Sequence, residues 1–297
     1  MTTPLPLVDH PAPVVALSHL DDLWFQVAGT LCNLTCRHCF ISCSPHNRSF
    51  GFLDLETVWR HLDESVALGV KEYYFTGGEP FLNPDMTAIL ELTLRYGPAT
   101  VLTNGTVFKE EWLDRLAQAE AESPYSLEFR VSIDGFTAAD NDPVRGPGTF
   151  ERALRGVRQL LAHGFLPIVT ITRTRDDQDD AELVAGFLAL LKANGYDRPR
   201  LKVLPTLRIG AEVERQRGYR DEERVTPEMI EGFDTGKLVC EHSRIVSDRG
   251  VHVCPILVEA PDALLGSTLA ESLRDYALRH QACYTCYQYG NICSNPR

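Results

Sequence analysis

Hydrophobic and polar positions follow two alternating periods between residues 20 and 205. Short runs rich in β-branched and aromatic residues alternate with longer segments whose apolar positions recur every three to four residues, which predicts strands alternating with helices. This order predicts a parallel sheet and, with fewer than eight units, a partial (β/α)6 barrel of the TIM type. The expected strands are 23–27, 72–76, 100–103, 127–133, 168–172 and 201–204, and the expected helices are 55–68, 83–97, 109–121, 150–163 and 180–193.

Several predicted helix ends coincide with residues that suit a helix terminus. Asp54 precedes the first helix as a candidate N-cap, and Gly69 follows it as a stop signal. Asn83 is expected to cap the second helix, with Pro84 at its first position. Gly164 is expected to end the helix at 150–163.

The alternation stops after Pro205, and the composition of the chain changes. Residues 208–235 are polar and charged, and Pro227 starts one short helix at best. The segment 236–297 holds five of the nine cysteines but few long apolar runs. A module this small is marginal without extra support, so we expect metal to stabilise it. The predicted domains are therefore 1–207, the barrel, and 208–297, a small cysteine-rich domain.

The charge of the chain narrows the range of partners. The sequence has 29 Lys plus Arg against 41 Asp plus Glu, a formal net charge of −12, which argues against a nucleic-acid-binding surface. The first 20 residues lack the pattern of a signal peptide, and no apolar run reaches the ~20 residues of a membrane span. We therefore expect a cytoplasmic protein without membrane contact. Thiols stay reduced there, and clustered cysteines more often bind metal than pair with each other.

The first cysteine cluster lies directly after the first predicted strand. Cys32, Cys36 and Cys39 follow the spacing C-x3-C-x2-C, and three thiolates on one loop suit three corners of a cubane iron–sulfur cluster. Zinc is the alternative, with a fourth ligand from His38, His46 or Cys43.

Together with a second motif, this spacing resembles the radical S-adenosylmethionine (SAM) superfamily. The second motif is Gly77-Gly78-Glu79-Pro80 after the second strand, which on its own would be read as a turn. The resemblance implies a [4Fe–4S] cluster whose unique iron binds the amino and carboxylate groups of SAM. It also implies that the backbone of Gly77 and Gly78 and the side chain of Glu79 contact the SAM amino group.

Further positions resemble those that bind SAM in this superfamily. Asn104 ends the third strand, and Ser132 and Asp134 end the fourth, where ribose hydroxyls would need partners. Arg145 opens the segment Arg-Gly-Pro-Gly-Thr-Phe, and the resemblance implies that its guanidinium pairs with the SAM carboxylate. The alternatives are ordinary turns at 104–105 and 134–135, and a solvated surface charge at Arg145.

The C-terminal cysteines resemble the auxiliary-cluster extension called SPASM or, in its shortened form, twitch. The resemblance implies one auxiliary cluster, expected to be [4Fe–4S], because the chain stops four residues after Cys293. Cys293 is left over or replaces one of the four ligands, and a structural zinc site is the alternative. The expected ligands are Cys240, Cys254, Cys283 and Cys286.

The predicted function is that of a radical SAM oxidoreductase or related radical enzyme. The resemblance implies one-electron reduction of the first cluster, cleavage of SAM to a 5′-deoxyadenosyl radical, and hydrogen abstraction from a small-molecule or peptide substrate. A donor such as flavodoxin or ferredoxin would supply the electron. Cys43 is a candidate hydrogen-atom donor or metal ligand, or a buried structural thiol. The alternative function is a non-catalytic iron–sulfur or zinc-binding redox or scaffold protein.

Overall fold

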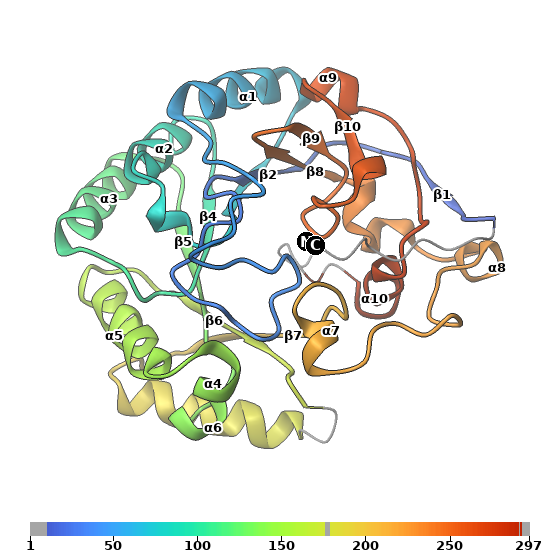
Figure 1. Cartoon of the computed structure of the whole chain (residues 1–297). Helices are drawn as coiled ribbons and strands as arrows, with labels where there is room; N and C mark the ends of the chain where they lie inside the picture. Colours follow the sequence, from blue (N-terminus) through green and yellow to red (C-terminus); the bar gives the residue numbers. More distant parts are fainter. Residues whose placement is uncertain (1–10, 176–178, 291, 293–297) are drawn as a thin grey trace.

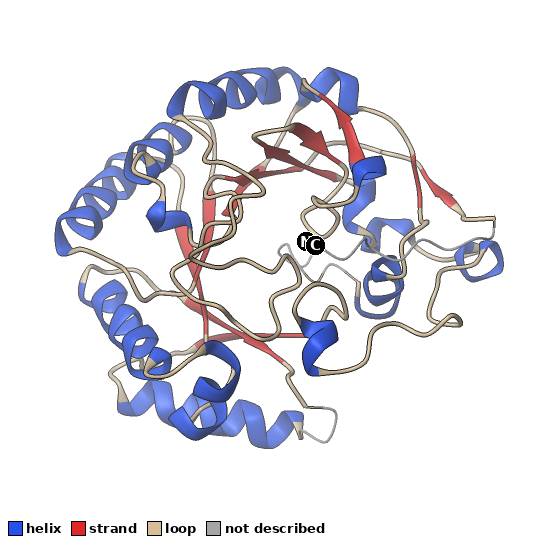
Figure 2. Cartoon of the chain, viewed as in Figure 1, coloured by secondary structure: helices blue, strands red, loops and turns tan. Residues whose placement is uncertain are grey.

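Six parallel strands form the centre of the molecule, and each pairs with the next one along the chain. The computed structural model describes residues 11–175, 179–290 and 292. Figure 2 shows the strands along the inner side of an arc whose outer side is covered by helices. The predicted partial (β/α)6 barrel is confirmed. The strands are β2 (Asp22–Gln26), β3 (Glu72–Thr76), β4 (Ala99–Thr103), β5 (Leu127–Ser132), β6 (Ile168–Thr172) and β7 (Arg200–Leu204).

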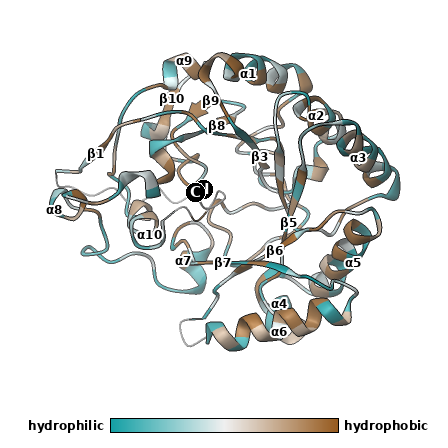
Figure 3. Ribbon diagram, turned by 180° about the vertical axis from the view of Figure 1, so that it is seen from behind, coloured by the Kyte–Doolittle hydropathy of each residue, from teal (hydrophilic) through white to brown (hydrophobic). Residues whose placement is uncertain are grey.

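The helices that connect these strands lie on the outside of the arc (Figure 1). Brown and teal stripes on α1, α3 and α5 in Figure 3 mark their apolar and polar faces. The Asp54 carboxylate caps α1 by accepting the Thr57 N–H, and Gly69 ends it in the left-handed conformation, as predicted. The helices are α1 (Leu55–Leu68), α2 (Met86–Thr93), α3 (Glu110–Glu122), α4 (Ala138–Arg145), α5 (Thr149–Ala162) and α6 (Asp180–Ala193).

The start expected for the second helix is wrong. Helix α2 starts at Met86 and ends at Thr93, and Asn83 does not cap it. The Asn83 amide instead donates to the carbonyls of Val27 (2.7 Å) and Leu53 (2.8 Å), so it joins two ends of the loop after β2. Helix α4, which contains Pro143, is not among the helices expected from the sequence.

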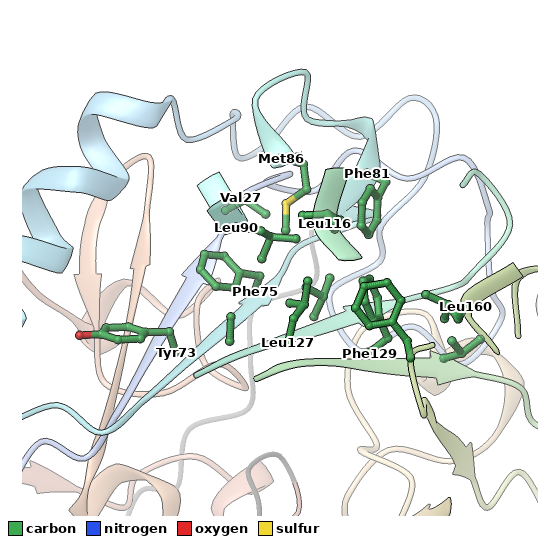
Figure 4. Packing of buried hydrophobic residues seen from close by; sticks show 14 of the residues in the cluster. Val27, Tyr73, Phe75, Phe81, Met86, Leu90, Leu116, Leu127, Phe129 and Leu160 are labelled. Carbon is green, nitrogen blue, oxygen red and sulfur yellow. The ribbon is translucent and has the colours of Figure 1, made fainter. Parts of the chain in front are cut away.

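The main core lies between the sheet and the helices. Successive residues of a strand face opposite sides, so Tyr73 and Phe75 of β3 point toward the helices while Tyr74 points into the barrel. Figure 4 shows Phe75 beside Leu90 and Phe129 beside Leu160. Each fully buried side chain of this size stabilises the fold by about 1.5–3 kcal/mol.

The C-terminal segment extends the same sheet. Strand β8 (Ser243–Ser247) pairs in parallel with β2, and β9 (Gly250–His252) and β10 (Leu264–Gly266) continue it in antiparallel order. A second apolar cluster packs among residues of this segment. The main core includes Val246 and Leu269, and the second cluster includes Val15, so apolar packing and the sheet both continue across residue 208. The domain boundary near this residue stays a prediction. The remaining elements are β1 (Val14–Val15), β11 (Tyr276–Ala277), α7 (Glu212–Arg215), α8 (Pro227–Ile230), α9 (Leu269–Ser272) and α10 (Ala282–Tyr289).

None of the helices in the described part of the chain combines the length and the apolar character that a membrane crossing requires.

Candidate functional site

One cavity of about 240 Å³ lies between the carboxyl ends of the parallel strands, the cysteine loop and the C-terminal segment. In a barrel of this type, the loops after the strands carry the chemistry. The predicted cluster ligands and SAM-binding residues that line this cavity come from five separate stretches of the chain. They are Cys32, Cys36, Cys39, Gly77, Gly78, Asn104, Ser132 and Arg145.

Each sulfur of the cysteine loop has a defined partner. Cys32 Sγ accepts from the Leu34 N–H (3.4 Å) and the Asn104 amide (3.7 Å). The Cys36 thiol donates to the Arg145 carbonyl (3.9 Å), and Cys39 Sγ accepts from the Cys43 N–H (3.3 Å). The loop is therefore held in place by β4, by α4 and by its own backbone.

The electrostatics of the three thiols fit a cationic ligand. Burial raises the pKa of Cys32 to about 12 and that of Cys36 to about 11, and neighbouring thiolates contribute to both shifts. Hydrogen bonds from Cys43 lower the pKa of Cys39 to about 6. Without a cation, three thiolates would repel one another at this site. Coordinated iron reverses that balance because it deprotonates its thiol ligands, so the donor set fits an iron–sulfur cluster.

The two glycines after β3 lie against the cysteine loop. A Cβ on Gly78 would stand 1.9 Å from the Leu31 carbonyl oxygen, and one on Gly77 would stand 2.9 Å from the Ala28 nitrogen. Gly77 also has φ +142°, which favours glycine. Only glycine lets the backbone approach this closely, and both residues line the cavity.

Glu79 lies just behind the cavity wall. Its carboxylate is fully buried and accepts from the Phe81 N–H (3.2 Å), the Thr103 hydroxyl (2.7 Å) and the Asn104 N–H (2.7 Å). Burial raises the pKa of Glu79 to about 7, although these hydrogen bonds favour its charged form. Glu79 therefore joins the ends of β3 and β4, and it is not among the residues that line the cavity.

A buried ion network joins the cysteine loop to β5 and α4. Asp134 Oδ2 lies 2.6 Å from Arg145 Nε and 3.0 Å from His38 Nε2, while Oδ1 accepts from the Thr172 N–H (2.8 Å). Burial opposes ionisation of Asp134, but Arg145 and His38 outweigh it and hold the pKa of this carboxyl well below its usual range. Asp134 lies behind the wall, so in this structure its partners are protein groups.

The remaining predicted positions are at the mouth of the barrel. Asn104 donates to the Asn33 side chain (2.9 Å) as well as to Cys32, and Ser132 lines the cavity at the end of β5. Cys43 also lines the cavity, and its thiol donates to the Gly77 carbonyl (3.9 Å). Its pKa is raised well above the ordinary value, first through its hydrogen bond with Cys39.

The four expected C-terminal ligands meet around a second, apolar cavity. Cys240, Cys254, Cys283 and Cys286 all line it, although they come from three stretches of the chain. Burial raises the pKa of Cys240 to about 12 and that of Cys254 to about 11. Within the described ranges, no group of three or more His, Cys, Asp or Glu side chains is arranged to hold a single metal ion. Cys293 lies outside the described residues.

Three basic residues near these cavities were missed from the sequence. Arg244 of β8 is fully buried and donates to four backbone carbonyls, including that of Cys240 (2.8 Å). Arg130 of β5 and Lys202 of β7 line the cavity of the cysteine loop. Period-two alternation would have placed these two side chains on the barrel interior together with Ser132 and Leu204. Two of the four carbonyls, those of Ser272 and Arg274, are distant from Arg244 along the chain, and no sequence signal indicates these contacts.

Comparison with known families and proteins adds to this geometry. The sequence pattern of the Radical SAM superfamily matches residues 27–184, just over half of the chain. The mycofactocin maturase MftC of Mycobacterium tuberculosis is 32% identical over 167 residues, which cover 54% of this chain and 41% of the relative. The AdoMet-dependent heme synthase of Methanosarcina barkeri is 35% identical over 144 residues, which cover 48% of this chain and 39% of the relative. The chain thus spans about two fifths of these relatives.

Among solved structures, Streptococcus suis SuiB bound to S-adenosylmethionine has a similar fold. The TM-score is 0.63 at 16% identity, and the match covers 83% of this chain and 63% of SuiB. At this identity the likeness concerns the fold alone.

Proposed function

The chain belongs to the radical SAM superfamily, and we propose that it cleaves SAM reductively and abstracts a hydrogen atom from a small-molecule or peptide substrate. The observation that supports this most strongly is the single cavity shared by Cys32, Cys36, Cys39 and the two glycines after β3. The superfamily implies the [4Fe–4S] cluster and SAM, and the three thiols fit the cluster by position and by charge. When bound, the reduced cluster supplies the electron that breaks a carbon–sulfur bond of SAM.

In this proposal, the residues of the cavity wall bind and orient SAM. The backbone of Gly77 and Gly78 accepts the SAM amino group, because no side chain separates it from the cavity. Arg145 binds the SAM carboxylate with its Nη groups while Asp134 holds its Nε atom (2.6 Å) and so fixes the plane of the guanidinium. Ser132 and Asn104 lie at the strand ends, where they meet the ribose hydroxyls.

The rest of the wall shields the reaction from water. Apolar side chains line it from the cysteine loop (Phe40, Ile41), from the segment after β7 (Leu207) and from the C-terminal segment (Val258). A reactive carbon radical needs such an enclosure, because a closed site limits side reactions.

Single cysteine substitutions test this assignment. Cys32→Ala, Cys36→Ala or Cys39→Ala should abolish 5′-deoxyadenosine formation under a strong reductant, since a three-thiolate site has no spare ligand. Cys43→Ala, in the same loop, is the control and should still cleave SAM. Full turnover by any one of the three variants would refute the assignment, and loss of the first cluster in Cys43→Ala would show that the ligand set is wrong.

For the C-terminal cavity we propose one auxiliary iron–sulfur cluster on Cys240, Cys254, Cys283 and Cys286. Anaerobically purified protein should then contain about eight irons, four for each cubane. The triple variant Cys32→Ala/Cys36→Ala/Cys39→Ala should keep about half of them. Zinc beside about four irons would mean a structural metal in the C-terminal segment, and about twelve irons would mean a third cluster.

For the substrate and the electron donor, we propose only a chemical class. Two relatives are a mycofactocin maturase and an AdoMet-dependent heme synthase, so both peptides and small molecules are candidate substrates. An external one-electron donor such as flavodoxin or ferredoxin would reduce the cluster. We place the protein in the cytoplasm, because cysteines that bind clusters must stay reduced and the cytoplasm keeps thiols reduced.

A further inference from the structure

Basic side chains from β5, β7 and α4 line the cavity of the cysteine loop, although the chain as a whole has a net charge of −12. Arg130 of β5 is 2% exposed and lines the cavity, as does the half-buried Lys202 of β7. Arg145 is the third basic residue of the wall. No Asp or Glu is among the described residues that line this cavity. A wall of this composition attracts an anion.

Strand register places Thr170 of β6 beside these cations. Ser132, Thr170 and Lys202 pair directly across β5, β6 and β7, so their side chains form a row on the barrel interior. Thr170 is 8% exposed, and its Oγ1 has no hydrogen-bond partner among the described residues. Buried hydroxyls are normally satisfied, so an unpartnered one that lines a cavity indicates a polar ligand.

The orientation of Arg130 is fixed on two sides. Its Nε donates to Glu128 Oε1 (3.2 Å), and its guanidinium carbon lies 5.4 Å from the centre of the Tyr74 ring. Glu128 also accepts Arg200 Nη2 on its other oxygen (2.6 Å), so one carboxylate is shared by two guanidinium groups. A guanidinium held in this way is prepared for a planar anion.

Apolar side chains face the cavity next to this basic row. Trp24 stacks on Tyr74 at 4.3 Å, and Leu204 and Leu207 follow Lys202 along the chain. The Trp24 Nε1 atom is buried without a partner among the described residues. A ligand with an apolar body and one anionic end matches this arrangement of surfaces.

We propose that Arg130, Lys202 and Thr170 form an anion-binding subsite that holds a carboxylate or phosphate group of the substrate. This inference rests on the proposed function, because it places the substrate beside the SAM bound by Arg145. The two cations would bind the anionic oxygens, the Thr170 hydroxyl would donate a third hydrogen bond, and the apolar wall would hold the body of the molecule.

The test is a calorimetric titration of the anaerobically reconstituted protein with SAM bound. The probes are benzoate and phenyl phosphate, which separate a carboxylate from a phosphate ligand, and benzamide, which has the same shape as benzoate without charge. We expect one of the anions to bind and benzamide to bind at least tenfold more weakly. Lys202→Met should weaken anion binding at least tenfold, about 1.4 kcal/mol, and Lys202→Arg should restore most of it. Lys192→Met, on the exposed face of α6, is the matched control and should bind like the wild type.

Several results would overturn the inference. They are benzamide binding as tightly as the tighter-binding anion, undiminished anion binding by Lys202→Met, and no saturable binding of either anion at millimolar concentration. A parallel loss of SAM affinity in Lys202→Met would also overturn it, because Lys202 would then belong to the SAM site. Failure of SAM cleavage by the wild type, with the benzoate results intact, would reject the proposed function and leave the anion subsite standing.

Discussion

Asp134→Asn is expected to be one of the most damaging single-atom changes in the barrel. Asp134 is buried, its Oδ2 forms ion pairs with Arg145 (2.6 Å) and His38 (3.0 Å), and its Oδ1 accepts from the Thr172 N–H (2.8 Å). An asparagine can keep the contact with Thr172 through its carbonyl oxygen, but its NH2 group then faces the Arg145 Nε–H. The substitution therefore leaves a buried guanidinium without its counter-charge.

The size of the effect follows from that loss. Removal of one partner from a buried ion pair costs about 3–5 kcal/mol, while a domain has about 5–15 kcal/mol of stability in total. Since His38 lies between Cys36 and Cys39, the cysteine loop should also lose its attachment to β5. We expect a loss of about 3 kcal/mol or more, together with weaker SAM binding.

Urea unfolding under anaerobic conditions measures the stability, and equilibrium dialysis with SAM measures the binding. Asp140→Asn is the matched control, because Asp140 is exposed at the start of α4 and accepts from the Thr137 hydroxyl (2.6 Å). It should stay within about 1 kcal/mol of the wild type, as exposed changes usually do. If Asp134→Asn were equally mild, the network around Asp134 would not hold the loop as described.

Three further predictions follow from single buried contacts. Because the pKa of Glu79 is about 7 in the folded chain against an ordinary 4.5, the folded state keeps a proton that the unfolded state has lost between these values. The free energy of unfolding should therefore fall as pH rises from 4.5 to 7. Urea midpoints of Glu79→Gln should fall less over this pH range than those of the wild type, and an equal fall would contradict the prediction. Gly78→Ala should lower SAM affinity at least about tenfold in dialysis, since its Cβ would stand 1.9 Å from the Leu31 carbonyl oxygen, whereas Gly218→Ala should be neutral. Arg244→Met should lose iron from the C-terminal segment while the first cluster keeps about four irons, and unchanged iron content would show that Arg244 does not brace Cys240.

The sequence predicted the barrel well, because its long helices and strands follow clear periods. Helices α1 and α6 and strands β3 and β6 match the expected ranges residue for residue. Helix α4 could not be predicted in this way, since its formation depends on contacts outside the local pattern. One such contact is that of Asp142, which accepts the Gly148 and Phe150 N–H groups at the start of α5.

At the site too, residues of local motifs could be predicted from the sequence, whereas contacts between distant segments could not. Cys32, Cys36, Cys39 and the two glycines belong to motifs whose spacing is local, and the structure brings them to one cavity. The partners of Asp134 and Glu79 come from other strands and turns, so only the folded chain shows that both carboxylates are internal. Arg130 is an intermediate case. Alternation along β5 predicts that its side chain points into the barrel, but not which groups surround the guanidinium there.

The most direct test of the central claim is an electron paramagnetic resonance spectrum of the reduced protein before and after SAM is added. If the cluster held by Cys32, Cys36 and Cys39 binds SAM through its unique iron, the signal of the reduced cluster should change when SAM is added. The change should be absent in Cys32→Ala/Cys36→Ala/Cys39→Ala, which should keep only the signal of the proposed C-terminal cluster. A wild-type spectrum that does not respond to SAM, or a response that persists in the triple variant, would contradict the account.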